Sequence, residues 1–543
     1  MTATLPPQGD LPTHAVTNQP AEEGDRDLWA GDAALRAAVA AGQGDAAALA
    51  RHGAALGTAA LRAAGREASR HPPELWLFDR GGRRLDEVAF HPAYHDFLRL
   101  GLGAGYAARP WQDAAGGHVT HAALVYLHSQ VEPGSCCPMT MTYAAVPLLS
   151  DLPDWRAAAL SRRYDPAVAP LAAKAGATLG MAMTEKQGGS DLRATATRAE
   201  RDGAHWRLTG HKWFCSAPMS DGFLTLAQTG AGLTCFLVPR WLEGSRNAIR
   251  LMRLKDKLGN RANASAEIEY DRAFALQVGA EGRGIATIIA MVHHTRLDTA
   301  IAPAGIMRAA LAEALRWAAG RTAFQRRLID QPLMRAVLAD LALDWEGAVA
   351  LGFRVARAFD GIAEADRALA RIGVALAKFL ANKRCVAVVA EAMECLGGMG
   401  YVEETGLPLL YREAPLNGIW EGSGNVICLD ILRTLEREPL AAEVLAAELD
   451  AARGADRAYD AALADFRRRW PGAVPEAGAR AFAERAALLL TASVLLREAP
   501  EAVGAAYAAA RLGERGLIHG AGAAVDAAAL LSRLGPDGDA AAG

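Results

Sequence analysis

The sequence predicts an α+β protein in which helical and β segments occupy separate stretches of the chain. Apolar residues recur every three or four positions up to about residue 176 and again from about residue 282, which is typical of amphipathic helices. Between these stretches they gather in short β-like runs, most with Gly, Pro or Asp close by. This order predicts an N-terminal helical domain, a central antiparallel β-domain, a C-terminal helical bundle and an extra helical C-terminal domain.

The composition is that of a soluble globular protein. The chain has 543 residues, 51% of them hydrophobic, so about three or four domains are expected. A formal net charge of −3 gives no support to wholesale nucleic-acid binding. No apolar run reaches the ~20 residues of a membrane span, and no secretory signal is visible, so we expect a cytoplasmic protein. Seven cysteines without CxxC spacing and dispersed histidines predict no disulfide framework and no metal site.

The N-terminal third divides into two parts. Residues 1–25 are polar and aperiodic and predict a flexible N-terminal arm, poorly ordered at least to Pro12. Residues 26–176 predict a helical domain, with apolar positions at helical spacing and breaks at prolines such as Pro92 and Pro153. Within this domain, the polar stretch Val131 to Thr142 either lines a pocket or forms an internal loop.

The remaining chain predicts three further domains. Residues 177–280 form the β-domain, with strands expected at 206–209, 223–227, 234–238 and 266–270. Residues 281–438 form the helical bundle, with long helices expected at 285–324, 334–360, 364–396 and 426–437. Residues 439–543 are alanine-rich and predict the C-terminal helical domain, with a break at Pro471 and Pro475.

The stretch from Met183 to Asp191, MTEKQGGSD, is too polar for a core and too rich in glycine for a helix. Gly188 and Gly189 let the backbone approach a ligand and turn its N–H groups toward an anion. Thr184 and Ser190 add hydroxyl groups. The chemistry indicated is a phosphate or the edge of a heterocycle, although a solvated hairpin loop would need the same residue types.

Two further stretches accompany this loop, His211–Ser216 (HKWFCS) and Ile419–Asn425 (IWEGSGN). Together the three resemble the acyl-CoA dehydrogenase superfamily, and most closely its AidB-like branch of alkylation-response flavoproteins. The resemblance covers roughly Thr13 to Leu435, with a looser extension to the end. Residues 16–20 resemble the start of that branch, where such arms serve assembly; a plain flexible tail is the alternative.

The resemblance implies a bound FAD. In the superfamily an aromatic side chain and a hydroxyl two residues later contact the flavin ring, and Phe214 and Ser216 hold those positions. Ser190 would bind the pyrophosphate and Thr184 the ring edge. The full set of cofactor-binding residues implied within one chain is Met183, Thr184, Gly189, Ser190, Phe214, Cys215, Ser216, Ser423 and Asn425.

The family also completes its flavin site with residues of a neighbouring subunit. Arg321 and Phe324 match the arginine and aromatic of that contact, but Gln325 replaces its glycine. Gly397 and Gly398 match the family's second flavin contact across subunits. Without the resemblance, these glycines would indicate only a helix C-cap. These matches imply a homo-oligomer, most simply a tetramer built as a dimer of dimers.

Glu421 matches the catalytic base of many members. The chemistry needs a carboxylate that removes the α-proton of an acyl thioester while the flavin accepts the β-hydride. We expect Ile419, Trp420 and Val426 to desolvate this carboxylate and raise its pKa. The alternative role for Glu421 is to cap or brace a loop.

The residues at the family's substrate-binding positions match the family pattern less completely. Arg296 corresponds to an arginine that helps to bind substrate, but His293 stands where relatives often carry an acid. This argues against ordinary acyl-CoA recognition and does not argue against flavin. The substrate is therefore expected to be a small hydrophobic molecule, with an acyl-CoA as one candidate.

The branch places DNA binding in the C-terminal region. The candidates are Arg433, the cluster Arg467–Arg468–Arg469–Trp470, Arg511 and Arg515, whose arginines could neutralise phosphates without reading bases. From Ala441 to Gly543, however, the chain contains 11 arginines, no lysine and 14 acidic residues, so this region has no positive net charge. A solvated helical face explains the arginines equally. The two functions predicted are thus an FAD-dependent acyl-CoA dehydrogenase-like oxidoreductase and, alternatively, a double-stranded-DNA-binding protective protein with a structural or weakly catalytic flavin.

Overall fold

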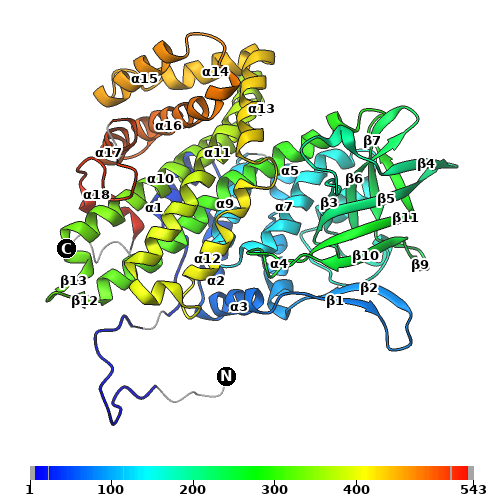
Figure 1. Ribbon diagram of the computed structural model, residues 1–543, viewed down its shortest axis with the longest axis horizontal. Helices are drawn as coiled ribbons and strands as arrows, with labels where there is room; N and C mark the ends of the chain where they lie inside the picture. Colours follow the sequence, from blue (N-terminus) through cyan, green and yellow to red (C-terminus); the bar gives the residue numbers. More distant parts are fainter. Residues whose placement is uncertain (1–6, 22–23, 114, 514–515, 536–543) are drawn as a thin grey trace.

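The computed structural model of the chain describes residues 7–21, 24–113, 115–513 and 516–535. Figure 1 shows a β-domain at one end of the molecule and long helices that extend away from it. The predicted fold class is confirmed, because an N-terminal helical region, a middle β region and a C-terminal helical region follow one another along the chain. None of the described helices is long and apolar enough to cross a bilayer.

The N-terminal region is built around two helices that are buried on nearly every side, α6 and α7. Val131–Thr142 is therefore not a loop, since α7 begins inside it and the Glu132 carboxylate caps the preceding turn by accepting N–H bonds from Gly134 and Ser135. The β1–β2 hairpin was not predicted, because it lies in a stretch that was expected to be helical. The elements are α1 (Ala33–Ala41), α2 (Ala46–Leu56), α3 (Ala59–Arg70), β1 (Glu74–Phe78), β2 (Arg84–Ala89), α4 (Pro92–Ala104), α5 (Arg109–Gln112), α6 (Gly117–Ser129), α7 (Cys136–Ala145) and α8 (Pro153–Ala159).

The β-domain is one seven-stranded sheet in which β7 pairs with both β6 and β11 and so closes a ring of strands. Most pairs are antiparallel, but β6 runs parallel to β3 and β4. Its inner residues, such as Phe223 and Phe236, are fully buried. The strands are β3 (Leu179–Ala182), β4 (Arg198–Asp202), β5 (His205–Ser216), β6 (Gly222–Thr229), β7 (Gly232–Pro239), β10 (Ile249–Leu254) and β11 (Ser265–Val278), with a small β8–β9 hairpin (Trp241–Leu242, Ser245–Arg246) beside them.

The C-terminal bundle is dominated by three long helices that pack on one another, α9, α10 and α11. Helix α9 ends at Gly320 rather than at Phe324, because Phe324 and Gln325 adopt positive φ and turn the tight β12–β13 hairpin. The elements are α9 (Gly284–Gly320), β12 (Thr322–Ala323), β13 (Arg326–Arg327), α10 (Pro332–Asp360), α11 (Glu364–Cys395), α12 (Leu407–Glu413) and α13 (Gly424–Arg437).

The last helices pack directly on this bundle, with α14 and α16 against α11 and with α16 also against α10 (Figure 1). They are α14 (Pro439–Asp450), α15 (Arg457–Arg469), α16 (Ala479–Glu498), α17 (Glu501–Leu512) and α18 (Ala527–Leu531). At the other end of the chain, the N-terminal arm is tied to the β12–β13 hairpin. The Asn18 side chain exchanges hydrogen bonds of 2.7 and 2.8 Å with the Thr322 backbone, and Arg321 donates to the Asn18 carbonyl at 2.6 Å.

Candidate functional site

The loop Met183–Asp191 leaves β3 as a tight glycine-containing turn. Glu185 and Gly188 exchange two backbone hydrogen bonds of 3.0 and 3.1 Å, and Gly188 has a φ of +149° that favours glycine. A Cβ atom at Gly189 would collide with the Thr184 hydroxyl. Ser190 is exposed at the end of the turn, while Met183, Thr184 and Gly189 are half-buried. The loop therefore presents small groups and backbone to its outer side, as a phosphate or ring edge requires.

A buried ion pair supports this loop from below. Glu185 accepts hydrogen bonds from Lys212 Nζ at 2.7 Å and from Thr197 Oγ1 at 2.6 Å, and neither charged side chain exceeds 1% exposure. Burial alone would raise the pKa of the Glu185 carboxyl, but Lys212 and the hydrogen bonds outweigh it and lower that pKa to about 2. The pair links the loop to β5. Sequence reasoning did not find this ion pair, because Glu185 was considered only as part of the loop motif.

Strand β5 carries a bulge where it faces the loop. Its pairing with β11 shifts between Ala266 and Ile268, so Trp213 and Phe214 occupy the place of one residue. The bulge turns Phe214 outward, where its side chain is 45% exposed and lies 4.8 Å below Lys255 Nζ. Ser216 is half-buried, with Oγ 3.3 Å from Ser265 Oγ.

The predicted cofactor contact of Cys215 is wrong for its side chain. Cys215 is fully buried in the β-domain core, on the face of β5 opposite Phe214 and Ser216. Side chains of a strand alternate between faces, so a ligand beside Phe214 meets at most the Cys215 backbone.

Glu421 stands in a strained loop before α13, with a φ of +57°. Thr295 Oγ1 on α9 donates to its carboxylate at 2.7 Å, and Arg296 Nε donates to its backbone carbonyl at 3.1 Å. Lys378 on α11 donates to the Gly422 carbonyl at 3.0 Å. Two helices, α9 and α11, therefore hold the loop that carries this carboxylate in its strained conformation, and such strain is typical of functional sites.

Burial raises the pKa of the Glu421 carboxyl, although the Thr295 hydrogen bond and the Lys378 and Arg296 charges oppose this rise. The source of the burial differs from our expectation. Ile419 is 65% exposed and cannot desolvate the carboxylate, whereas Trp420 is half-buried and donates its indole N–H to Asn417 at 2.7 Å.

Cys137 connects Glu421 to the β-domain. Its buried thiol lies near Ser216 and within the electrostatic reach of Glu421, and burial raises its pKa to about 12. Lys257 is also nearby, with Nζ 3.1 Å from Ser265 Oγ. The structure thus brings Ser216 and Glu421, far apart in sequence, to the same place. Sequence reasoning did not assign Cys137 or Lys257 to the site, because both lie outside the three stretches Met183–Asp191, His211–Ser216 and Ile419–Asn425.

His293 and Arg296 differ in what they offer a substrate. The His293 ring stacks on Phe359 at 4.6 Å, and burial lowers its pKa to about 3, so the side chain is uncharged. The Arg296 guanidinium is engaged by the protein itself, through the Glu421 carbonyl and through Asp430 at 2.7 Å. Arg296 therefore braces the Glu421 loop, and its contact with substrate stays a prediction.

The N-terminus of α13 gathers cationic side chains. Ser423 and Asn425 are exposed there, and Arg480 of α16 donates to Asn425 Oδ1 at 2.8 Å. A Cβ atom at Gly424 would lie 3.3 Å from Lys383 Nζ. These cations and the helix dipole favour an anion at this helix start. Sequence reasoning did not find Lys383 or Arg480, because they come from other helices.

The residues predicted to act across subunits lie far from the loop of their own chain. Arg321 and Phe324 follow α9, whose 37 residues span about 55 Å from its start beside the β-domain. Phe324 is 93% exposed at the hairpin tip. Gly397 and Gly398 follow α11 toward the same end, and a Cβ at either would meet open space. One described chain therefore does not unite them with Ser190.

The DNA candidates have different outcomes. Arg467, Arg468 and Arg469 are exposed at the end of α15, where Arg467 pairs with Asp450 and Arg468 with Asp465. Arg511 is 5% exposed and pairs with Asp340 and Asp344, so the prediction that it contacts DNA is wrong. Arg433 is exposed on α13. Arg515 lies outside the described residues.

The chain matches three family models in sequence. They are described as the adaptive response protein AidB N-terminal domain at residues 18–166, the acyl-CoA dehydrogenase middle domain at 180–273, and the acyl-CoA dehydrogenase C-terminal domain at 282–436. AidB of Escherichia coli (strain K12) is 46% identical over 520 residues, which cover 93% of this chain and 96% of AidB. Acyl-CoA dehydrogenase family member 11 of Caenorhabditis elegans is 34% identical over 68% of this chain and 63% of its own length.

Two solved structures resemble most of the chain. ACDH-11 of Caenorhabditis elegans in complex with C11-CoA gives a TM-score of 0.81 at 28% identity and covers 91% of both chains. An acyl-CoA dehydrogenase from Bacillus anthracis complexed with FAD gives 0.62 at 17% identity, over 74% of this chain and 76% of its own. The second likeness concerns the fold alone.

Proposed function

Because the chain belongs to the acyl-CoA dehydrogenase family, in its AidB-like branch, we propose that it is an FAD-dependent oxidoreductase acting on the α and β carbons of a small hydrophobic acyl group. The observation that carries the proposal is Glu421, a braced carboxylate of raised pKa that shares the neighbour Cys137 with Ser216. C11-CoA in the Caenorhabditis elegans relative supports a CoA thioester as the acyl carrier.

The residues present fit FAD. The Gly188–Gly189 turn leaves room at Ser190, Phe214 offers an exposed aromatic face, and Lys383 and Arg480 supply positive charge at the α13 N-terminus. When bound, FAD supplies the acceptor for the hydride that leaves the β carbon. Ser190 and the loop backbone would hold phosphate, and Ser216 would donate to the ring.

In this chain Glu421 would take the α-proton. The raised pKa makes its carboxylate a stronger base near neutral pH than an exposed glutamate. Thr295 keeps one carboxylate oxygen hydrogen-bonded, so the other is directed away from α9. The experiment that tests cofactor binding is a visible spectrum of the gently purified protein, where retained flavin bands support the proposal and a colourless protein that binds no added FAD contradicts it.

The same proposal requires an oligomer, a dimer of dimers, in which Arg321, Phe324, Gly397 and Gly398 complete the flavin site of another subunit. Phe324→Asp is expected to weaken FAD binding roughly tenfold, because an exposed aromatic contact becomes a charge beside phosphates. FAD titration with the flavin-to-protein absorbance ratio after gel filtration measures the effect. Ile362→Asp, at the 91% exposed turn between α10 and α11, is the control. Equal affinity in both variants would contradict the shared site.

A second candidate function is binding of double-stranded DNA in a protective response to alkylating agents. The match to an adaptive response protein model and the exposed position of Arg433 support it. Arg433→Glu is expected to weaken duplex binding roughly tenfold at ~50 mM salt, where phosphate contacts are strongest. Arg83→Glu serves as the control, because Arg83 is exposed on the β1–β2 turn, outside the C-terminal region, and already pairs with Asp79. Absence of duplex binding by the unaltered protein at that salt concentration removes this candidate.

A further inference from the structure

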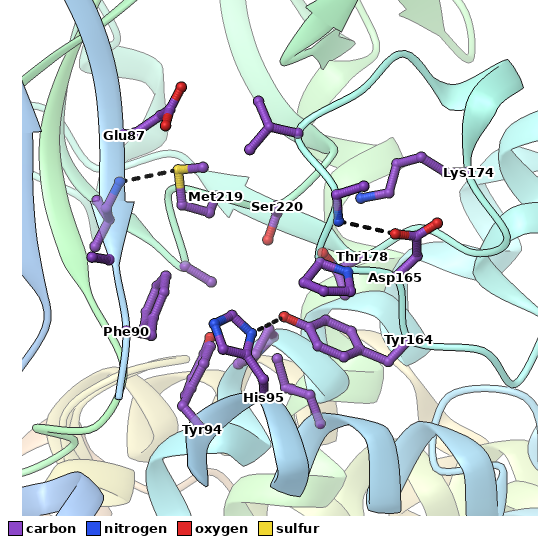
Figure 2. A pocket seen from close by; sticks show the side chains of 18 of the residues that line it. Glu87, Phe90, Tyr94, His95, Tyr164, Asp165, Lys174, Thr178, Met219 and Ser220 are labelled. Atoms are coloured by element: carbon purple, nitrogen blue, oxygen red, sulfur yellow. Dashed lines mark hydrogen bonds between the residues drawn. The ribbon is translucent and has the colours of Figure 1, made fainter. Parts of the chain in front are cut away.

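A cavity of about 290 Å³ lies away from the α13 helix start, between α4, the end of β2 and the turn that follows β5. Figure 2 shows it open in the middle, with aromatic rings below and Met219 and Ser220 above. Its wall includes Pro138 and Ala217, the residues directly after Cys137 and Ser216. It therefore backs onto the candidate flavin site without sharing the side chains assigned there.

The cavity walls combine polar and apolar surface in nearly equal parts, and one side is aromatic. The rings of Phe90 and Tyr94 stack face to face at 4.2 Å with only 7° between their planes, and this aromatic pair forms part of the wall. Leu98, Met219 and Trp241 also line the space. Flat aromatic walls favour a planar ligand, because offset stacking adds to the burial of apolar area.

Two uncharged polar groups of this wall, Ser220 and His95, are placed to bind a ligand. Ser220 is 3% exposed, and its hydroxyl has no hydrogen-bond partner among the described residues. In Figure 2 that hydroxyl points into the cavity, above the ring of His95. Tyr164 fixes the ring through a 2.6 Å hydrogen bond to His95 Nδ1, which leaves Nε2 for another partner. A buried hydroxyl without a partner calls for one, and a polar group of a ligand in the cavity would supply it.

The charged side chains of the wall are already satisfied. Lys174 pairs with Asp221, and Glu87 pairs with Arg246. Asp165 accepts backbone N–H bonds from Ala167 and Ala175 at 2.9 and 3.0 Å. Burial lowers the pKa of His95, which keeps its ring neutral. A charged ligand would find no free counter-charge here and would lose its hydration.

We infer that this cavity binds a neutral aromatic molecule of two fused rings that carries one hydroxyl or carbonyl group. The rings lie against Phe90 and Tyr94, and the polar group bonds Ser220 Oγ and His95. The size follows from volume, since an apolar cavity of ~150 Å³ accommodates benzene and this one is roughly twice as large. The site is separate from the proposed dehydrogenase function and does not depend on it.

The test is calorimetric titration of the purified full-length protein with 2-naphthol. We expect one molecule per chain, with roughly tenfold weaker binding in Ser220→Ala through loss of one hydrogen bond. Met219→Trp fills the space and is expected to abolish binding. Met252→Trp places the same bulk on exposed β10, where Met252 is 44% exposed, and is expected to bind as the unaltered protein does.

Three results would overturn the inference. They are no binding of 2-naphthol to the unaltered protein, undiminished binding in both Ser220→Ala and Met219→Trp, and equally tight binding of naphthalene-2-sulfonate, whose charge the cavity should reject. If Met219→Trp does not fold, the affinity of Ser220→Ala for 2-naphthol, compared with that of the unaltered protein, decides whether the inference holds.

Discussion

Replacing Glu421 with glutamine is expected to slow substrate-dependent flavin reduction by about 10³-fold, the contribution typical of a positioned general base. Glutamine keeps the size of the side chain and can still accept the Thr295 hydrogen bond, but it cannot take the α-proton. Stopped-flow absorbance under anaerobic conditions measures the rate. The exposed Glu404 provides the control, and Glu404→Gln should leave the rate unchanged.

The pH dependence of the flavin reduction rate provides a second test of Glu421 as the base. Only the carboxylate form of Glu421 accepts a proton, so the reduction rate should rise with pH through the pKa of Glu421, which burial raises. Thr295→Val removes a hydrogen bond that lowers this pKa, and the rising limb should move to higher pH. A Glu421→Gln rate within threefold of the unaltered protein would contradict the assignment of the base.

Replacing Lys212 with methionine is expected to destabilise the β-domain by about 3–5 kcal/mol, because Glu185 would keep a buried charge without its partner. The Met183–Asp191 loop should lose its support, so FAD retention should fall as well. Differential scanning calorimetry and flavin release on heating measure the two effects. Lys186→Met changes an exposed lysine of the same loop and should cost less than about 1 kcal/mol.

A double variant separates the lost pair from general damage. Glu185→Gln combined with Lys212→Met removes both charges and should recover part of the stability. In the unaltered protein the pKa of Glu185 is lowered from its ordinary 4.5 to about 2. Its stabilising contribution is therefore complete above pH 4.5 and is lost as the pH falls toward 2. An unchanged unfolding temperature in Lys212→Met would contradict this role of the pair.

Helical periodicity predicted the long elements well because their apolar faces are local in sequence. The helix expected at 364–396 is observed at Glu364–Cys395, and that expected at 334–360 at Pro332–Asp360. The end of α9 was placed four residues late, because the apolar Phe324 was taken as the last residue of the helix, whereas Phe324 and Gln325 form a turn with positive φ. The β1–β2 hairpin was missed because it lies inside a stretch read as helical throughout.

The candidate site was predicted only where its residues are adjacent in sequence. The residue types around Gly189 are enough to predict the turn there. The Glu185–Lys212 ion pair, by contrast, joins positions 27 residues apart. Arg511 shows the opposite error. Its charge suggested a surface contact, whereas Asp340 and Asp344, about 170 residues earlier, pair with it in the core. Contacts of this kind depend on how whole helices pack, which composition and spacing do not encode.

The measurement that tests the proposed function most directly is anaerobic addition of a panel of short and medium acyl-CoA thioesters to the purified flavin-containing protein. Bleaching of the flavin bands by at least one thioester, and no bleaching in Glu421→Gln, is the predicted result. Flavin bands that persist with every thioester, in a protein that chemical reductants still bleach, would contradict a working dehydrogenase and favour the DNA-binding alternative.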